Sequence, residues 1–221
     1  MHTLPQAGRP GTLRQVRLSR YYLLAVIGGV VWRCLRLGMY FEMTGDESNI
    51  VRSVMERRFA GLLAPLDYSA VSPPMFLWMT KVMDAVFRNE WGVRLVPFLA
   101  GMGAIGMFWL ICRLALRGTA RWAAWAAFCV SYVPIAEGTR AKGYTLDLLV
   151  ATVLLWLALR WLTGKQEPRW LVWLAVGAPV FIWLSYTSVF IIAAVALIVA
   201  ARLLRMPFWN SAAKAHSRQP Y

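Results

Sequence analysis

Six apolar windows, each close to the length of a bilayer-spanning helix, dominate this chain. They cover residues 21–41, 92–112, 121–136, 143–162, 169–186 and 188–205. A helix needs about 20 mostly apolar residues to cross the hydrocarbon core of a membrane. The chain is 59% hydrophobic, whereas soluble globular proteins are about 45–50% apolar. We therefore predict an all-α fold, a polytopic membrane helix bundle with about six transmembrane helices.

The basic residues are distributed unequally between the two sides of the predicted membrane. With a cytoplasmic N-terminus, fourteen of the 24 Lys and Arg residues and one of the 10 acidic residues fall on the cytoplasmic side. This excess follows the positive-inside rule. The net charge of +14 therefore does not require nucleic acid. We predict membrane lipid as a partner and no nucleic-acid partner.

The windows also divide the chain. Residues 1–20 are predicted to be a cytoplasmic basic tail, residues 21–205 the transmembrane domain, and residues 206–221 a polar C-terminal tail. Cys34, Cys112 and Cys129 lie inside windows without CxxC spacing, and both histidines lie in the tails. This pattern supports neither a disulfide framework nor a metal site, and no cofactor is expected.

Residues 42–91 are the one long segment between windows. They are too apolar for a disordered connector, and we predict that they contain two interfacial amphipathic helices. The first runs over about residues 46–64. The second begins at Pro73-Pro74, since proline suits the first turn of a helix, and ends near Phe87.

Two adjacent carboxylates, Asp46 and Glu47, directly follow the first window. Carboxylates close to hydrocarbon are costly and therefore mark functional sites. A carboxylate can act as a general base on an acceptor hydroxyl. Arg94, Arg140 and Lys142 fall on the same predicted face and could hold a phosphate. The pattern favours a reaction between a group linked to a lipid phosphate and a polar acceptor on the non-cytoplasmic side.

Structural interpretations of the same residues remain open. Asp46 could cap a helix that begins near Glu47, and Arg94 could anchor the chain at the interface. Arg33 and Arg36 are expected to extend to the outer headgroups, with a substrate phosphate as the second interpretation.

Two further acids adjoin the outer cations. Glu137 and Asp147 could simply pair with Arg140 and Lys142. A small transporter would have to use Asp147 alone as an ion-binding carboxylate within a span, and we therefore rank this function below an enzyme.

Five motifs occur in a fixed order along residues 20–205. They are Arg33-Cys34-Leu35-Arg36-Leu37-Gly38, Asp46-Glu47, Ser72-Pro73-Pro74-Met75-Phe76, Asn89-Glu90-Trp91-Gly92-Val93-Arg94-Leu95-Val96-Pro97 and Ala141-Lys142-Gly143-Tyr144. In this order and spacing they resemble the GT-C glycosyltransferases, specifically the branch of protein O-mannosyltransferases and lipid A aminoarabinose transferases.

This resemblance implies an inverting glycosyltransferase that moves a sugar from a polyprenyl-phosphate donor to a hydroxyl acceptor on the non-cytoplasmic face. Asp46 would be the catalytic base and Glu47 a supporting carboxylate. Arg94, Lys142 and Arg140 would bind the donor phosphate. The resemblance implies no metal, and the lipid-linked sugar would be a co-substrate.

The resemblance also sets expectations about length and location. Members usually have several hundred residues, so we expect a truncated C-terminal tail and a missing C-terminal half or an additional subunit as partner. The alternative function is a non-catalytic remnant or partner subunit of such an enzyme. We expect a multi-pass protein of a bacterial inner membrane, with its active site facing the periplasm.

Overall fold

A computed structural model describes residues 10–39, 41–66, 71–164 and 167–216 of the chain. Within these ranges the regular structure is entirely helical, which confirms the predicted all-α membrane helix bundle. The helices are α1 (Pro10–Gly38), α2 (Gly45–Glu56), the 3₁₀ turn η1 (Ala60–Leu63), α3 (Pro74–Phe87), α4 (Glu90–Ala115), α5 (Gly118–Val130), α6 (Tyr132–Glu137), α7 (Tyr144–Thr163), α8 (Pro168–Leu184) and α9 (Ser188–His216).

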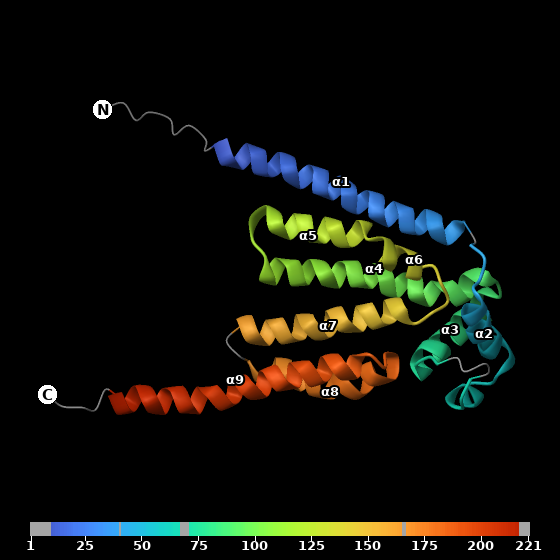
Figure 1. Ribbon diagram of the computed structural model, residues 1–221. Helices are drawn as coiled ribbons and strands as arrows, with labels where there is room; N and C mark the ends of the chain where they lie inside the picture. The colour runs from blue at the N-terminus through green and yellow to red at the C-terminus, as the bar shows by residue number, and fades with distance from the viewer. Residues whose placement is uncertain (1–9, 40, 67–70, 165–166, 217–221) are drawn as a thin grey trace.

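The long helices lie side by side, and consecutive long helices along the chain run in opposite directions (Figure 1). Helices α4 and α7 form the centre, with α1 and α5 on one side and α8 and α9 on the other. The short helices α2 and α3 cover one end of the bundle, and the described parts of α1 and α9 lead to the two chain termini at the opposite end. We call the end that carries α2 and α3 the site end.

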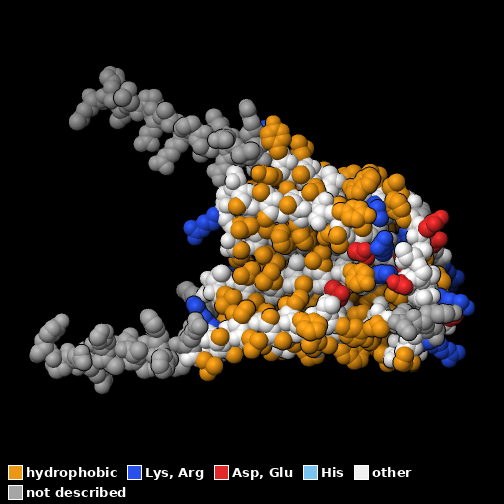
Figure 2. Space-filling model, viewed as in Figure 1, with side chains coloured by type: hydrophobic (Ala, Val, Ile, Leu, Met, Phe, Trp, Pro, Cys, Tyr) orange, Lys and Arg blue, Asp and Glu red, His pale blue; other side chains and the backbone are white. Residues whose placement is uncertain are grey.

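The surface reflects a lipid environment. Hydrophobic side chains cover the flank of the bundle, and acidic and basic side chains gather at the site end (Figure 2). Three described helices are long and apolar enough to cross a membrane: Ser19–Gly38, Glu90–Ala115 and Tyr144–Thr163. Pro168–Leu184 and Ser188–Arg202 are apolar but shorter. The protein is an integral membrane protein by these features.

The third predicted span is not one helix. It is divided at Ser131, whose backbone is extended, into α5 and the six-residue α6. Pro134 accounts for the break, because proline has no N–H to donate to the carbonyl of Val130 and its ring collides with that carbonyl. The break turns the chain toward the site end, where residues 138–143 form the loop into α7.

Several helix boundaries differ from the predicted ones. Helix α1 begins at Pro10, within the predicted tail, and α9 continues to His216, because a helix can extend past the apolar window into basic sequence. Residues 1–9 and 217–221 of the predicted tails lie outside the described residues. Helix α2 ends at Glu56 and is followed by η1, whereas the prediction was one helix to about residue 64. Helix α3 was predicted correctly.

Helices α2 and α3 are fixed to the bundle by apolar packing and by two side chains of α3. Ile50, Val54 and Leu62 pack with buried residues of α3, α4 and α7 in one cluster. Lys81 donates a hydrogen bond from Nζ to the Val54 carbonyl at 2.7 Å, and Trp78 donates from Nε1 to the Phe59 carbonyl at 2.9 Å. These contacts fix the position of α2, including its acidic first turn, relative to α3 and the bundle.

Helices α1 and α5 approach closely at Gly29. The Arg33 guanidinium, on the next turn of α1, donates hydrogen bonds to the carbonyls of Gly29 and Cys129. Arg33 is 2% exposed, so the prediction that it extends to the headgroups was wrong. The Cys129 carbonyl lies just before the break at Ser131, where regular helical bonding ends, and this accounts for its use of a side-chain donor.

We expect Gly29→Ala to destabilise the bundle, because a Cβ at this position would lie 2.8 Å from the carbonyl carbon of Cys129. Overpacking of this kind costs about 1–3 kcal/mol. Gly28→Ala is the matched control, since a Cβ there would meet no described atom within 4 Å. Thermal unfolding in detergent should show a lower Tm for Gly29→Ala alone. Equal Tm values for the two variants would contradict the close packing of α1 on α5.

Candidate active site

Glu47 connects α2 to the loop between α6 and α7. Its side chain is 1% exposed, and Oε1 accepts a hydrogen bond from the Ala141 backbone N–H at 2.7 Å. Oε2 faces the backbone N–H of Thr44, the N-cap of α2, at 3.4 Å, as in a capping box. The buried carboxylate therefore determines where residues 138–143 lie relative to α2.

Asp46 and Lys142 meet beside this connection. Lys142 Nζ lies 3.5 Å from Asp46 Oδ2, and the Asp46 side chain is 85% exposed whereas that of Lys142 is 14% exposed. Asp46 stands in the first turn of α2, and Thr44 is the N-cap, so the alternative that Asp46 caps the helix was wrong. The structure brings an accessible carboxylate and a shielded ammonium together from positions 96 residues apart.

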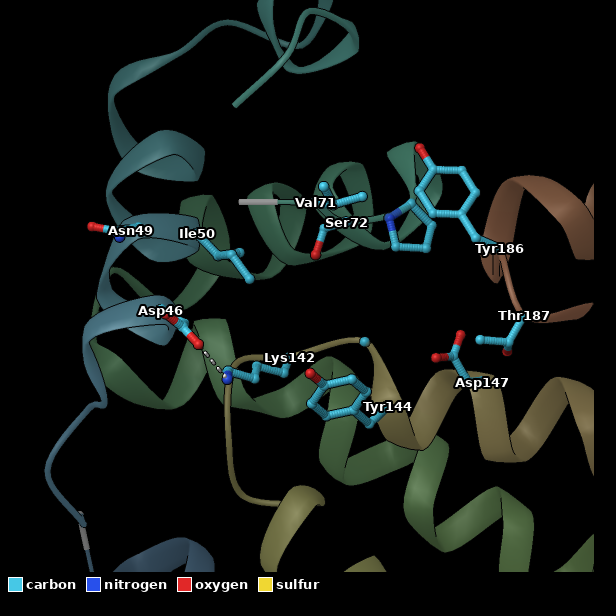
Figure 3. A pocket seen from close by; sticks show the side chains of 12 residues that line it. Asp46, Asn49, Ile50, Val71, Ser72, Lys142, Tyr144, Asp147, Tyr186 and Thr187 are labelled. Atoms are coloured by element: carbon cyan, nitrogen blue, oxygen red, sulfur yellow. Dashed lines mark hydrogen bonds and ion pairs between the residues drawn. The ribbon is translucent and has the colours of Figure 1, made fainter. Parts of the chain in front are cut away.

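The Asp46–Lys142 pair lies at the edge of a cavity of about 320 Å³ at the site end. Figure 3 shows the pair on one side of the cavity and Asp147 and Thr187 on the other, with Tyr144 between them. The complete lining is Asp46, Asn49, Ile50, Val71, Ser72, Pro73, Lys142, Gly143, Tyr144, Asp147, Tyr186 and Thr187. Because α2, the loop before α7 and the link between α8 and α9 all contribute, we call it the α2–α7 cavity.

A second cavity, of about 330 Å³, lies on the α1 side of Glu47. Its lining includes three arginines, Arg36, Arg94 and Arg140, with Phe41, Glu42, Glu47 and Thr139. We call it the arginine cavity. Since Glu47 and its neighbour Asp46 each line one cavity, the two cavities flank the first turn of α2.

The arginines of this cavity are already engaged with the protein. Arg94 is 2% exposed and donates from Nη2 to the Phe41 carbonyl at 2.6 Å. Arg36 donates from Nε to Thr139 Oγ1 at 3.1 Å and stacks on the Phe41 ring. Arg140 pairs with Glu137 at 2.9 Å. These contacts fix the segment between α1 and α2 as well as lining the cavity.

The predicted site residues thus gather at one end of the bundle but divide into two groups. Asp46 and Lys142 belong to the α2–α7 cavity, and Glu47, Arg94 and Arg140 to the arginine cavity. Arg36 was expected to extend to the outer headgroups, but its side chain contacts Thr139 and Phe41 instead. No group of three or more potential metal ligands occurs among the described residues.

Sequence reasoning missed the far wall of the α2–α7 cavity. Asp147 was considered as an ion-pair partner, and Tyr186 and Thr187 were not considered because they lie in a link of a few residues between two apolar windows. The signal available was the polar cluster Ser185–Ser188 within an otherwise apolar stretch. Its nearness to Asp147 depends on how α7, α8 and α9 pack, which periodicity alone does not specify.

Comparison with models of protein families shows to which family the chain belongs. The model of the dolichyl-phosphate-mannose-protein mannosyltransferase family matches residues 71–215. The chain belongs to this family. It is accordingly a membrane glycosyltransferase of the GT-C kind, as the sequence motifs predicted. No curated protein and no solved structure matches the chain.

The mannosyltransferase-family match covers only some of the site residues. It includes Arg94, Arg140, Lys142 and Asp147, and it begins after Asp46 and Glu47. The assignment of the acid pair to the same site therefore rests on the structure, in which both acids contact the matched loop before α7.

Proposed function

We propose that this GT-C protein moves a sugar from a polyprenyl-phosphate donor to a hydroxyl acceptor on the non-cytoplasmic face, with inversion at the sugar carbon. One observation carries the proposal: the accessible carboxylate of Asp46 and the ammonium of Lys142 meet at the edge of the α2–α7 cavity. A general base and a cation for the leaving phosphate are the two groups that this reaction needs.

The proposed step is a single displacement. Asp46 accepts the proton of the acceptor hydroxyl, and the acceptor oxygen forms a bond to the anomeric carbon of the donor sugar. The bond from that carbon to the phosphate oxygen breaks, and polyprenyl phosphate leaves with both electrons of the bond. Lys142 stabilises the negative charge that develops on the phosphate. No metal or other cofactor takes part in this scheme.

Lys142 is the best placed of the three predicted phosphate-binding residues. It lies beside the proposed base. Its ammonium pairs with the Asp46 carboxylate, and an incoming phosphate can form an ion pair with the same ammonium. Arg94 is buried, and its Nη2 is occupied by the Phe41 carbonyl. We therefore assign Arg94 to positioning the segment before α2, and Arg140 to the arginine cavity.

A lipid-linked donor agrees with the surroundings of the cavity. A third cavity, of about 390 Å³, shares Val71, Ser72 and Tyr186 with the α2–α7 cavity, and much of its remaining lining is apolar: Leu62, Leu63, Ala64, Pro65, Leu66, Pro74 and Leu77. An apolar space that adjoins the α2–α7 cavity suits the first isoprenoid units of a polyprenyl chain.

The distribution of charge supports the non-cytoplasmic orientation. The basic excess described above lies in the two tails and in the links after α4 and α7, and the C-terminal ends of α4 and α7 lie opposite the site end (Figure 1). By the positive-inside rule the site end would face away from the cytoplasm. In a bacterial inner membrane this side is the periplasm.

Membranes from cells that express the protein should transfer labelled sugar from a polyprenyl-phosphate donor and not from the corresponding nucleotide sugar. Mannose and glucose donors are both used, because the sugar is unidentified. In right-side-out vesicles, membrane-impermeant periodate should oxidise the transferred sugar. Transfer from the nucleotide sugar alone, or a product protected from periodate, would contradict the donor or the orientation.

A non-catalytic role is the other outcome of this assay. A partner subunit predicts no transfer by the purified protein and recovery of transfer when a second membrane protein is added. The paired carboxylate and ammonium at an accessible cavity favour an enzyme, because a purely structural pair does not need an adjoining cavity.

A further inference from the structure

The wall of the α2–α7 cavity opposite Asp46 is polar and is built from two separate parts of the chain. Asp147 belongs to the first turn of α7, and Tyr186 and Thr187 belong to the link between α8 and α9. The Asp147 carboxylate and the Thr187 side chain lie next to one another in Figure 3, across the cavity from Asp46 and Lys142. The proposed displacement assigns no role to this wall.

Hydroxyl groups lie beside the Asp147 carboxylate. The Thr187 side chain lies next to it in Figure 3, and Thr187 Oγ1 shares a hydrogen bond of 3.0 Å with Ser185 Oγ. Ser185 is fully buried, and its carbonyl accepts a hydrogen bond from Ser188 Oγ at 2.6 Å. These bonds fix the turn that places Thr187 beside the carboxylate.

The carboxylate retains capacity for a ligand. Its two oxygens offer about four acceptor positions, and the single hydroxyl proton of the adjacent Thr187 can occupy at most one of them. Asp147 also lines the open cavity, so the remaining positions are accessible. A neutral ligand with several hydroxyl donors matches such a group better than an anion, which the carboxylate would repel.

Aromatic rings border the same space. Tyr144 is 56% exposed and Tyr186 46% exposed, and both line the cavity. The Tyr144 ring lies between Lys142 and Asp147 (Figure 3), with Lys142 Nζ 5.7 Å from the ring centroid. An apolar ring face beside a carboxylate suits a sugar, which presents C–H groups on its faces and hydroxyls at its edge.

We propose that Asp147, with Thr187 beside it in the cavity wall, binds hydroxyls of the donor sugar. The proposal rests on the proposed function, since it presumes that the sugar arrives on a lipid phosphate. The sugar then lies over Tyr144 with its phosphate at Lys142, and the acceptor hydroxyl held by Asp46 approaches the anomeric carbon from the face opposite the phosphate. Asp147 is a binding residue that selects the sugar, and the proton transfer stays with Asp46.

A structural role for Asp147 makes a different prediction. A carboxylate in the first turn of a helix interacts favourably with the helix dipole, and Asp147 lies beside Thr187 of the link between α8 and α9. Loss of these interactions would lower Tm and weaken every ligand of the cavity to a similar extent. Binding of the sugar alone would not be affected selectively.

Two probes separate the roles: polyprenyl phosphate without a sugar, and the same lipid phosphate carrying mannose or glucose. Both are titrated against the full chain in lipid nanodiscs. For Asp147→Asn we expect roughly ten-fold weaker binding of the sugar-bearing lipid, the size expected for one hydrogen bond to a charged group. Binding of the sugar-free lipid should be unchanged. Lys142→Met should weaken the binding of both probes.

Two further variants keep the test decisive. Asp84→Asn makes the same chemical change on α3, outside the cavity lining, and should leave both affinities unchanged. Thr187→Val removes the hydroxyl beside Asp147 in the cavity wall while keeping the shape of the side chain. It should weaken the binding of the sugar-bearing lipid, by a smaller factor than Asp147→Asn. This variant keeps the test decisive even if Asp147→Asn fails to fold.

Each other result overturns an identified part of the proposal. If Asp147→Asn and Thr187→Val weakened the binding of both probes equally, or if neither variant weakened binding, Asp147 would not bind the sugar. A wild-type protein that binds the sugar-bearing lipids no more tightly than the sugar-free lipid would do the same. A wild-type protein that binds neither probe would show that the lipid-linked donor itself is wrong.

Discussion

Asp46→Asn should lower the rate of sugar transfer by about 10²–10⁴-fold, the usual contribution of a general base. The amide keeps the size of the side chain but cannot accept the proton of the acceptor hydroxyl. Stability should change little, because the ion pair with Lys142 is mostly open to solvent on the Asp46 side and such pairs contribute little. The rate is measured with saturating lipid-linked donor, so that a change in donor affinity does not contribute.

The matched control is Glu56→Gln on the same helix. Glu56 also forms an exposed ion pair, with Arg52 at 2.9 Å, but it does not line the α2–α7 cavity. Its transfer rate should equal that of the wild type. If Asp46→Asn and Glu56→Gln transferred sugar at the same rate, another group would have to be the base.

Glu47→Ala should impair both folding and transfer. It removes the acceptor of the hydrogen bond that the Ala141 backbone N–H donates, and Ala141 is fully buried. Leaving such a donor unpaired costs about 1–3 kcal/mol, and for a chain of this size that corresponds to a decrease in Tm of several degrees. The loop that carries Lys142 would also lose its attachment to α2, so donor binding should weaken.

Glu47→Gln separates the two consequences. The amide oxygen can still accept the hydrogen bond from Ala141, so Tm and transfer should both decrease less than in Glu47→Ala. Thermal unfolding in detergent and the transfer assay are carried out on the same preparations. If Glu47→Ala retained the wild-type Tm, the proposed connection between α2 and the loop before α7 would be wrong.

The sequence was sufficient to predict elements whose ends carry local signals. Pro74 at the start of α3 is such a signal, and the apolar windows predicted where the long helices lie. Helix α2 was predicted too long, because apolar residues continue at helical spacing into η1. The break at Ser131 was missed, although Pro134 lies within the predicted span, since periodicity averages over a single proline.

The site was only partly predictable for a different reason. The acids and cations could be assigned to one face from the alternation of spans, and the structure places them around the two cavities that flank the first turn of α2. Which cation meets which acid depends on the packing of α4 against α7 and on the loop that follows α6. That packing divides Lys142 from Arg94 and buries Arg33 beneath the break in the third span.

The contact between Glu47 and Ala141 has a consequence for biosynthesis. The two residues are 94 positions apart, and the membrane segments α1, α4 and α5 are synthesised before Ala141 leaves the ribosome. During that time Glu47 lacks its partner, and the first turn of α2 cannot take its final place. The contact between α2 and the loop before α7 therefore forms late in membrane insertion, after that loop has left the ribosome. Until then the nascent protein holds an acidic helix end whose buried carboxylate lacks its backbone partner in the loop.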